Sequence, residues 1–470
     1  MNRGTQAPTV AIPSRFPLIL QPENRTNSTL KDAKLINGYM ERGLREGEYW
    51  LFKRPGLRQT GLAQSGLGLG VYNWDGDIYS IFGTTLYRNG AGVGTVNVTG
   101  GVYKFSSSLG GQHRMQLSNG VGSYNYDPIN GLVPIVGANF PSDVVKGWAY
   151  LDGTTYVLSR SSSIRGCAVI NEPQDWSDTL NRISVQIEPD DGIALNKQLV
   201  YVIALSQWST EVFYDQQNPS GSPLGPTQGA KINYGCANTD SVQEMDGLLF
   251  WVATNRGAAP QVLMLDNLKP SIVSSAPVER ILGEGDLTAV YSFAIKYAGH
   301  RFYGFTLLND NITMVYDVSE KLWAQWTDVN GNYWPIVSNT FSESLGRILQ
   351  HRSNGKLYTF DSSYTTDDNS LITVDLYTPN FDGGVRTRKQ LNRLEVIADQ
   401  EAGSILNIRH NDFDFAHDRW TNFRNLDLNV EKPMLANEGT FMRRAYHLRH
   451  KCNTRLRLQA LEMSLDMGTL

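Results

Sequence analysis

Short apolar runs alternate along this chain with a recurring turn signal. The signal is an Asx-Gly pair, which is typical of a tight β-hairpin because a type I′ turn needs positive φ at both central residues. Five full pairs and two looser versions stand before apolar runs. In chain order these turns are Asp75-Gly76, Asn119-Gly120, Asp152-Gly153, Asn196-Lys197, Asp246-Gly247, Gly299-His300 and Asn354-Gly355.

The spacing of these turns predicts a β-propeller. They recur roughly every forty to fifty-five residues, which is the length of one propeller blade. The spacing is uneven, with about 33 residues between Gly120 and Gly153, and it therefore leaves six or seven blades open. We expect an all-β fold in which residues 61–370 form the propeller.

The apolar runs predict the strands themselves. They are short and rich in aromatic and β-branched residues, which favour a pleated strand. Helical spacing is nearly absent, and one turn at Val278–Leu282 is the best candidate; residues 216–227 are predicted to form a loop. The predicted strands are Val71–Trp74, Ile78–Phe82, Trp148–Leu151, Thr155–Leu158, Leu199–Leu205, Leu248–Val252 and Ile312–Tyr316.

Two segments flank the predicted propeller. Residues 1–60 are predicted to be an extended N-terminal arm that packs on something else, with one short helical turn at Lys31–Asn37. Residues 371–470 are predicted to be an additional C-terminal all-β domain. Within it, the alternation of apolar residues over Leu456–Leu465 slips by one residue at Ala460. Such a slip reverses the faces of a strand, so we predict a β-bulge there.

The composition suits one large all-β chain. The 470 residues are 41% hydrophobic and 19% charged, with 44 glycines, 22 tyrosines and 10 tryptophans. The N-terminus lacks the continuous apolar core of a secretion signal. The longest apolar run, Leu199–Leu205, is too short to span a bilayer. We therefore expect a soluble chain with no membrane insertion.

The charge balance argues against a protein dedicated to gripping nucleic acid. Such proteins carry a basic excess because neutralising phosphates supplies most of their affinity, whereas this chain has a formal net charge of −4. A local basic stretch without acids runs from Met442 to Leu458. It is either a solvated strand face or a contact to an acidic partner protein or to passing DNA. The candidate contact residues are Arg443, Arg444, Arg449, Arg455 and Arg457.

Neither a cofactor nor a metal is expected. The glycine-rich run Gly66–Gly70 leads into a strand and a hairpin, whereas a dinucleotide-binding loop must open a helix. The three cysteines, Cys167, Cys236 and Cys452, lie far apart without metal-ligand spacing, so free thiols are expected.

Two further clusters resemble metal ligands. His447 and His450, near Cys452, would point to opposite faces of a strand, which argues against a shared zinc ion. Asp412 and Asp414 lie in a hairpin that looks like a degraded Asp-box, for which a plain hairpin tip is expected and calcium binding is the alternative.

A set of short motifs follows one another in a definite order over nearly the whole chain. They are Lys34–Glu41, Arg54–Leu57, Tyr150–Gly153 with Trp176, Ser209–Tyr214, Gly235–Ala237 with Ser241-Val242, Leu249–Trp251, Gly299–Tyr303, Val315–Val318 with Trp323, and the Trp420 hairpin with Arg443–Arg457. In this order they resemble the packaged-DNA stabilisation proteins of short-tailed bacteriophages (podoviruses), also called tail accessory, nozzle or tail hub proteins. Phe213 departs from the family, which often has Trp there.

The resemblance implies a structural, non-enzymatic virion protein. Such proteins form a homo-hexameric ring below the portal and its adaptor (the head–tail connector), retain packaged DNA and form the conduit for genome ejection. They also support the tail needle, fibre or spike proteins. On this basis the chain would assemble in the host cytoplasm into the phage tail, the C-terminal domain would make assembly contacts, and charge reversal at Arg443 and Arg444 would impair attachment to the portal complex.

Two other functions stay open from the residues alone. A propeller lectin or receptor-binding protein would use exposed Tyr and Trp rings to stack on sugars. A propeller hydrolase is the least favoured, because its carboxylates would have to converge. The densest acidic run, Glu188–Asp191, is equally typical of a solvated turn, and the seven histidines are dispersed.

Overall fold

Two compact units make up the chain in the computed structural model. The propeller unit comprises residues 58–313 and 333–360, and the sandwich unit comprises the residues up to Leu57 together with 314–332 and those from Asp361 onward. No helix among the described residues is long and apolar enough to cross a membrane. The structure describes residues 13–16, 18, 33–43, 48–110, 113–186, 188–413 and 418–467.

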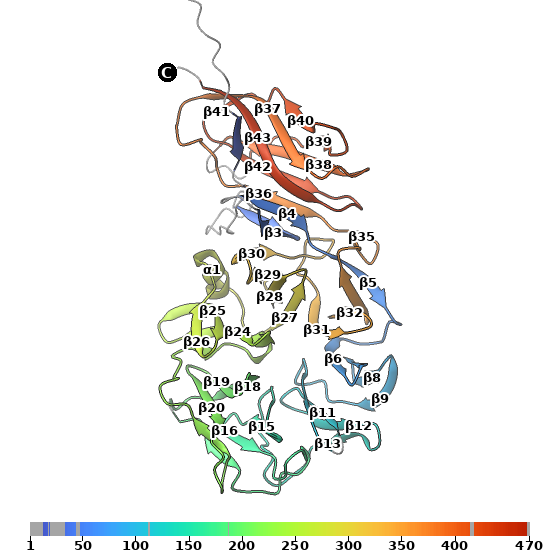
Figure 1. Ribbon diagram of the computed structural model, residues 1–470, viewed down its shortest axis with the longest axis vertical. Coiled ribbons are helices and arrows are strands. Elements are labelled where there is room, and N and C mark those ends of the chain that lie inside the picture. Colours follow the sequence, from blue (N-terminus) through green and yellow to red (C-terminus); the bar gives the residue numbers. More distant parts are fainter. Residues whose placement is uncertain are drawn as a thin grey trace, which may run out of the picture. The chain divides into compact units, whose positions relative to one another are not determined.

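The propeller unit is a ring of antiparallel sheets, each forming one blade (Figure 1). Neighbouring blades pack through their inner strands, and the ring closes where β31 (Ile336–Ser342) packs against β6 (Gly68–Trp74). The prediction of an all-β propeller is therefore confirmed.

The blades follow one another in chain order. The first blade contains β6, β7 (Asp77–Phe82), β8 (Thr85–Arg88) and β9 (Ala91–Thr95), and the second contains β10 (Lys104–Ser108), β11 (Arg114–Ser118), β12 (Ser123–Asp127) and β13 (Gly131–Pro134). The third contains β14 (Ala149–Leu151), β15 (Thr154–Leu158), β16 (Ser163–Gly166) and β17 (Arg182–Ser184), and the fourth contains β18 (Gly192–Gln198), β19 (Tyr201–Ser206), β20 (Thr210–Asp215) and β21 (Leu224–Pro226). The fifth contains β22 (Gly235–Cys236), β23 (Gln243–Met245), β24 (Leu248–Asn255), β25 (Ala258–Asp266) and β26 (Lys269–Ile272); the next begins with β27 (Val290–Tyr297) and β28 (His300–Leu307), and the last contains β31, β32 (Gly346–His351) and β33 (Leu357–Asp361).

The uneven spacing of the turn signals has a structural cause. Asp75, Asp152 and Asp246, each followed by glycine, adopt positive φ and connect the first strands of their blades. Asn119-Gly120 and Asn354-Gly355 lie one hairpin later, between β11 and β12 and between β32 and β33. The interval from Gly120 to Gly153 is short because it runs from a late hairpin to an early one.

One predicted turn is wrong. Asn196 and Lys197 are paired with Ile203 and Val202 in the ladder between β18 and β19, and the turn falls at Leu199-Val200. Gln198 explains this position, because its amide donates to the carbonyl oxygens of Gly247 (2.8 Å) and Leu265 (2.7 Å). These bonds to the next blade hold the last residue of β18 in place.

Two helical predictions had different outcomes. The turn expected at Val278–Leu282 is confirmed as part of α1 (Ala276–Glu284), which buries Val278 and Leu282. The short 3-10 helix η1 (Thr239–Ser241) was not predicted. The helical turn expected at Lys31–Asn37 is wrong where the structure describes it, because Lys34–Ile36 forms β2.

The sandwich unit consists of two sheets around one apolar core. Leu35, Leu376 and Leu448 of one sheet and Leu394 and Leu461 of the other belong to the same buried cluster. One sheet runs β3 (Gly38–Arg42), β4 (Tyr49–Lys53), β43 (Arg457–Met467), β37 (Lys389–Ala398) and β40 (Met434–Ala436), with β1 (Pro13–Phe16) on β43 and β41 (Thr440–Phe441) on β37. The other includes β30 (Leu322–Gln325), β2, β36 (Val374–Tyr377), β42 (Ala445–His450), β38 (Ile405–Asn411) and β39 (Arg424–Asp427).

The chain passes between the units at four points. Three of these lie inside the strands β5 (Gly56–Thr60), β29 (Ile312–Asp317) and β33, and the fourth lies between Asn332 and Tyr333. The short strands β34 (Thr366–Asp367) and β35 (Ser370–Leu371) complete the described elements. The expected order of arm, propeller and C-terminal domain thus differs from the division into units, since strands from the first sixty residues and residues 314–332 share a unit with the C-terminal segment. Residues 1–12, 17, 19–32 and 44–47 of the expected arm lie outside the described residues.

The predicted β-bulge is confirmed. In the ladder between β37 and β43, Ile397 pairs with Ala460 and Ala398 pairs with Leu458. Gln459 is therefore the extra residue, and it lets Leu458 and Leu461, three positions apart, oppose Ala398 and Val396, two positions apart, and enter the same buried cluster. The slip in the apolar alternation marks the place where the strand changes faces.

A buried arginine joins separate segments of the sandwich unit. Arg54 is 1% exposed. Its Nε donates to Asn37 Oδ1 (3.0 Å), while Nη1 donates to Asp367 Oδ1 (3.0 Å) and the Pro55 carbonyl (3.1 Å). Its Nη2 donates to Asp367 Oδ2 (2.5 Å) and the Thr327 carbonyl (3.1 Å). All five N–H donors of the guanidinium are thus satisfied.

Asn37 completes this arrangement. It adopts φ 57°, a left-handed conformation that Asn tolerates better than most residues. Its Nδ2 donates to Thr327 Oγ1 (2.8 Å) and the Thr373 carbonyl (2.9 Å), and its Oδ1 also accepts from the Thr327 amide (2.8 Å). The two N-terminal motifs of the sequence, Lys34–Glu41 and Arg54–Leu57, therefore meet in one hydrogen-bonded cluster.

We expect Arg54→Met to lower the free energy of unfolding by about 3–5 kcal/mol, because it removes the buried guanidinium and leaves the partly buried Asp367 carboxylate without its cation. The matched control is Arg388→Met, at an exposed position, which should change stability by less than about 0.5 kcal/mol. Urea denaturation of the full chain measures both. Equal midpoints for the two variants would contradict the role assigned to Arg54.

Candidate assembly site in the arginine segment

The basic stretch that the sequence singled out runs along β42 and into β43, two strands of the sandwich unit. Alternate side chains of a strand face opposite sides of its sheet, so the arginines do not share one surface. Each arginine therefore has its own surroundings.

Arg444 is buried, with 1% of its surface exposed. Its Nε and Nη2 bind the two oxygens of Asp412 at 2.6 and 2.8 Å, and its Nη1 donates to the Glu438 carbonyl at 2.8 Å. Its guanidinium also lies 4.4 Å from the ring centre of Phe441. Burial alone would lower the pKa of Arg444, but the hydrogen bonds to Asp412 raise it. Arg444 therefore offers no free charge to a partner.

Arg449 shares a carboxylate with His447. Its Nε lies 2.7 Å from Asp375 Oδ1, and His447 Nε2 lies 2.7 Å from the same oxygen. Burial of Asp375 opposes ionisation, but the bonds from His447 and Arg449 hold the pKa of this carboxyl below its ordinary value. The pairing follows from the sheet, because Arg449 and Asp375 are register partners on β42 and β36.

The other arginines are more accessible. Arg443 lies 3.5 Å from Asp382, and Arg457 lies 2.7 Å from Asp399. Arg455 is exposed and has no acidic partner among the residues that the structure describes. Sequence reasoning missed these acids because each one lies 32 to 74 positions away and becomes a neighbour only through strand pairing or loop packing.

The two histidines are buried structural groups. His450 Nε2 contacts Ser404 Oγ at 3.1 Å and Thr454 Oγ1 at 3.2 Å, and its Nδ1 is buried without a partner. Among the described residues, no group of three His, Cys, Asp or Glu side chains could hold a metal ion.

The Asp-box-like hairpin is described in part. Asp412 is the partner of Arg444, so its carboxylate is used within the unit. Asp414 and His417 lie outside the described residues, and the calcium alternative is not tested.

In the propeller unit, the run Gly66–Gly70 leads into strand β6 and not into a helix. A Cβ on Gly70 would lie 2.7 Å from the ring of Phe105, so close packing explains a glycine here.

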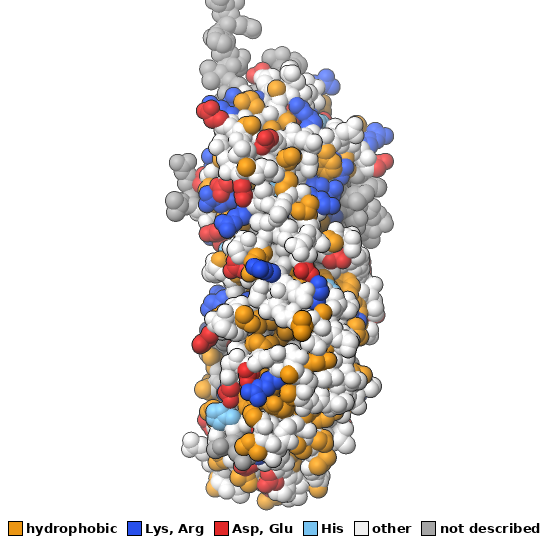
Figure 2. Space-filling view, turned by 90° about the vertical axis from the view of Figure 1, so that its right-hand side faces the viewer, with side chains coloured by type: hydrophobic (Ala, Val, Ile, Leu, Met, Phe, Trp, Pro, Cys, Tyr) orange, Lys and Arg blue, Asp and Glu red, His pale blue; other side chains and the backbone are white. Residues whose placement is uncertain are grey.

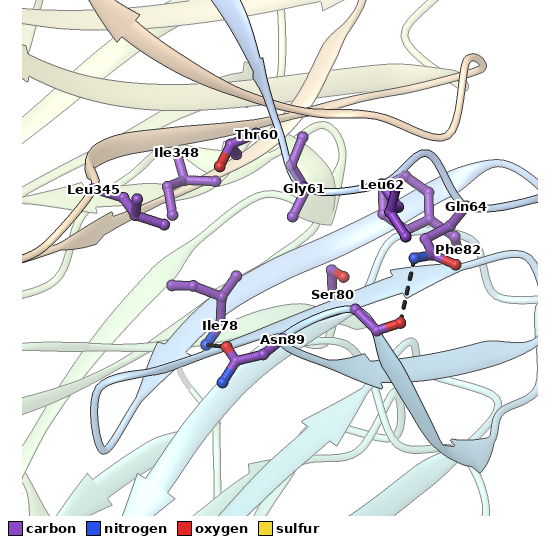
Figure 3. A pocket seen from close by; sticks show the side chains of 12 residues that line it. Thr60, Gly61, Leu62, Gln64, Ile78, Ser80, Phe82, Asn89, Leu345 and Ile348 are labelled. Atoms are coloured by element: carbon purple, nitrogen blue, oxygen red, sulfur yellow. Dashed lines mark hydrogen bonds between the residues drawn. The ribbon is translucent and has the colours of Figure 1, made fainter.

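An apolar cavity of about 430 Å³ lies beside this blade (Figure 3). Leu62, Ile78, Leu345 and Ile348 line it, and its Asn89 side chain is already used to bind the amide of Ile78 at 2.8 Å. On the face shown in Figure 2, acidic and basic side chains are interspersed, with no field of one sign. Neither the apolar cavity nor this face brings together a set of side chains able to carry out catalysis.

His450 should make stability depend on pH. Burial, together with the nearby Lys53 ammonium, lowers its pKa from 6.5 to about 4. The unfolded chain therefore binds this proton first, and stability falls as the pH drops from 6.5 to 4. The loss from this group is about 3 kcal/mol at the lower end. Urea denaturation across this range should show a weaker pH dependence for His450→Gln than for the control His113→Gln, and equal slopes would contradict the assignment.

Solved structures with similar folds include a virginiamycin B lyase from Staphylococcus aureus (8% identity, TM-score 0.44, covering 65% of this chain and 99% of that one). A streptogramin B lyase (10% identity, TM-score 0.41, 69% and 98%) and BamB from Moraxella catarrhalis (10% identity, TM-score 0.40, 75% and 97%) are similarly distant. Likenesses at this level carry no information about function. No curated protein matches the chain by sequence.

A protein-family model gives a more specific result. The family described as "Bacteriophage P22 Gp10, beta-propeller" matches residues 38–364. This range begins one residue after Asn37 and contains Arg54 and the whole propeller unit. The match confirms the resemblance to phage tail accessory proteins. Because it spans well over half of the 470 residues, the chain belongs to the bacteriophage P22 Gp10 β-propeller family.

Proposed function

We propose that this chain is a structural tail protein that forms a hexameric ring, the nozzle or tail hub, below the portal and adaptor. In this role it retains the packaged genome and later forms the conduit for ejection. The family match over residues 38–364 carries the proposal. The partners are further copies of the chain, the portal–adaptor complex, and a distal needle, fibre or spike protein; no reaction or cofactor is assigned.

Contacts at the centre of the propeller favour a DNA channel that is formed between several copies of the chain. Lys104 of the second blade donates to the Val242 carbonyl of the fifth at 2.9 Å. Lys146 of the third blade pairs with Asp240 of the fifth at 2.7 Å. These contacts join blades that are not neighbours and so cross the space around the propeller axis. A duplex cannot pass there, and a DNA conduit requires a channel between copies.

The net negative charge of the chain is compatible with DNA passing along a channel without being bound tightly. Duplex DNA carries one negative charge per about 1.7 Å of its axis, and a basic channel would hold it. Six copies at −4 each give a formal charge of −24. Moreover, four of the five arginines in the basic segment face acids of their own unit, which reduces the positive charge left for DNA.

Particles assembled without this protein should package DNA and then lose it. The expected result is a large fraction of empty heads and nuclease-accessible genome, restored to the wild-type level when purified protein is added before packaging ends. Electron microscopy of the restored tails should show six copies around a central channel. Genome retention equal to wild type in its absence would overturn the stabilising role.

Arg455 is the arginine best placed to test the assembly contact, because it is exposed and pairs with no acid among the described residues. Arg455→Glu should weaken attachment to the portal–adaptor complex by about tenfold, as expected for reversing one interfacial charge. Arg388→Glu, another exposed arginine of the same unit, is the control. Co-sedimentation with the complex measures both, and equal attachment would remove this segment from the interface. Arg444→Glu is unsuitable because it would disrupt the buried pair with Asp412.

A further inference from the structure

An open depression of about 910 Å³ lies on the propeller unit, beside the turn between β18 and β19. It collects residues from the β14–β15 turn, from β19 and β20, and from the segment that follows β21. Its lining differs from that of the apolar cavity in Figure 3, because aromatic rings here stand among carboxylates and amides.

Two tyrosines form the aromatic part of the lining. Tyr201 and Tyr214 are register partners on β19 and β20, so their side chains emerge on the same face of the blade. Tyr201 is half-buried against the core, while Tyr214 is 36% exposed. Neither hydroxyl has a hydrogen-bond partner among the described residues. The pair offers ring faces for stacking and two free hydroxyl groups.

Two carboxylates lie in the same depression without a basic partner among the described residues. Asp215 uses Oδ1 to accept from the Gln217 amide at 2.7 Å, which leaves Oδ2 available. Asp152 stands in the tight β14–β15 turn at φ 46° and is exposed. Gln228 adds an amide that can both donate and accept. The depression therefore offers acceptors and donors around the aromatic pair.

The rim includes an unusual turn. Leu199 adopts φ 53°, a left-handed conformation that is strained for a residue with a bulky side chain. Leu199 and Val200 are 56% and 61% exposed, although both are apolar. A polar turn would serve the hairpin equally well, so this apolar edge beside the depression has no explanation within the blade.

We propose that this depression binds a neutral oligosaccharide, a ligand beyond the role proposed for the ring. Sugar rings have apolar C–H faces for Tyr214 and hydroxyl pairs for Asp215, Asp152 and Gln228. The acidic lining disfavours phosphates and nucleic acid, since like charges repel. The open shape disfavours a purely apolar ligand, which is bound by enclosed pockets.

The purified full chain is first screened against an array of bacterial surface glycans, and affinity for the strongest neutral binder is then measured by calorimetry. Tyr214→Ala and Asp215→Asn should each weaken binding at least tenfold, whereas Tyr333→Ala, a half-buried tyrosine elsewhere on the propeller, should leave it unchanged. Melting temperatures check folding, and the exposed Gln228→Ala serves as a second variant that leaves the strands intact.

Several results would overturn the proposal. They are no glycan binding by the wild-type chain, binding that survives both substitutions, or preferential binding of Lys- and Arg-rich peptides that disappears at high salt, which would indicate a protein partner instead. Binding of a neutral glycan should persist between low and high salt. Particles carrying Asp215→Asn should retain DNA normally, so loss of glycan binding and failure of genome retention are distinguishable.

Discussion

The fully bonded guanidinium of Arg54 is the interaction on which the sandwich unit depends. A buried cation is tolerated only when its charge and all its donors are satisfied. Here the acceptors come from four separate stretches of chain, at Asn37, Pro55, Thr327 and Asp367. The unit can therefore form only when the N-terminal strands, the inserted residues 314–332 and the C-terminal segment are together.

This constraint explains why the chain leaves and re-enters the propeller. Residues 314–332 belong to the sandwich unit although propeller strands precede and follow them. The backbone approach is close, since a Cβ on Gly56 would lie 2.3 Å from the Thr366 carbonyl oxygen. The glycine is needed for this contact between β5 and the segment beside Asp367.

A similar principle applies to the arginine segment. A run of six basic residues without an acid suggests a surface that binds a polyanion, but strand pairing brings Asp375 to Arg449 and loop packing brings Asp412 to Arg444. The charges stabilise the unit, and Arg455 is left exposed without an acidic partner among the described residues. In the tail role proposed above, this arrangement leaves few positive charges available to bind DNA and restricts an electrostatic assembly contact to a few side chains.

The sequence by itself determined the local features. Asp-Gly turns predicted hairpins because their φ requirements are local, and the slip at Ala460 predicted the bulge because side chains alternate along a strand. Only the tertiary structure decided the turn at Leu199, which Gln198 sets through bonds to the neighbouring blade. It also decided the partners of Arg54 and Arg444 and the grouping of Tyr201, Tyr214 and Asp152. These depend on which strands become neighbours, and that is a property of long-range packing rather than of any window of residues.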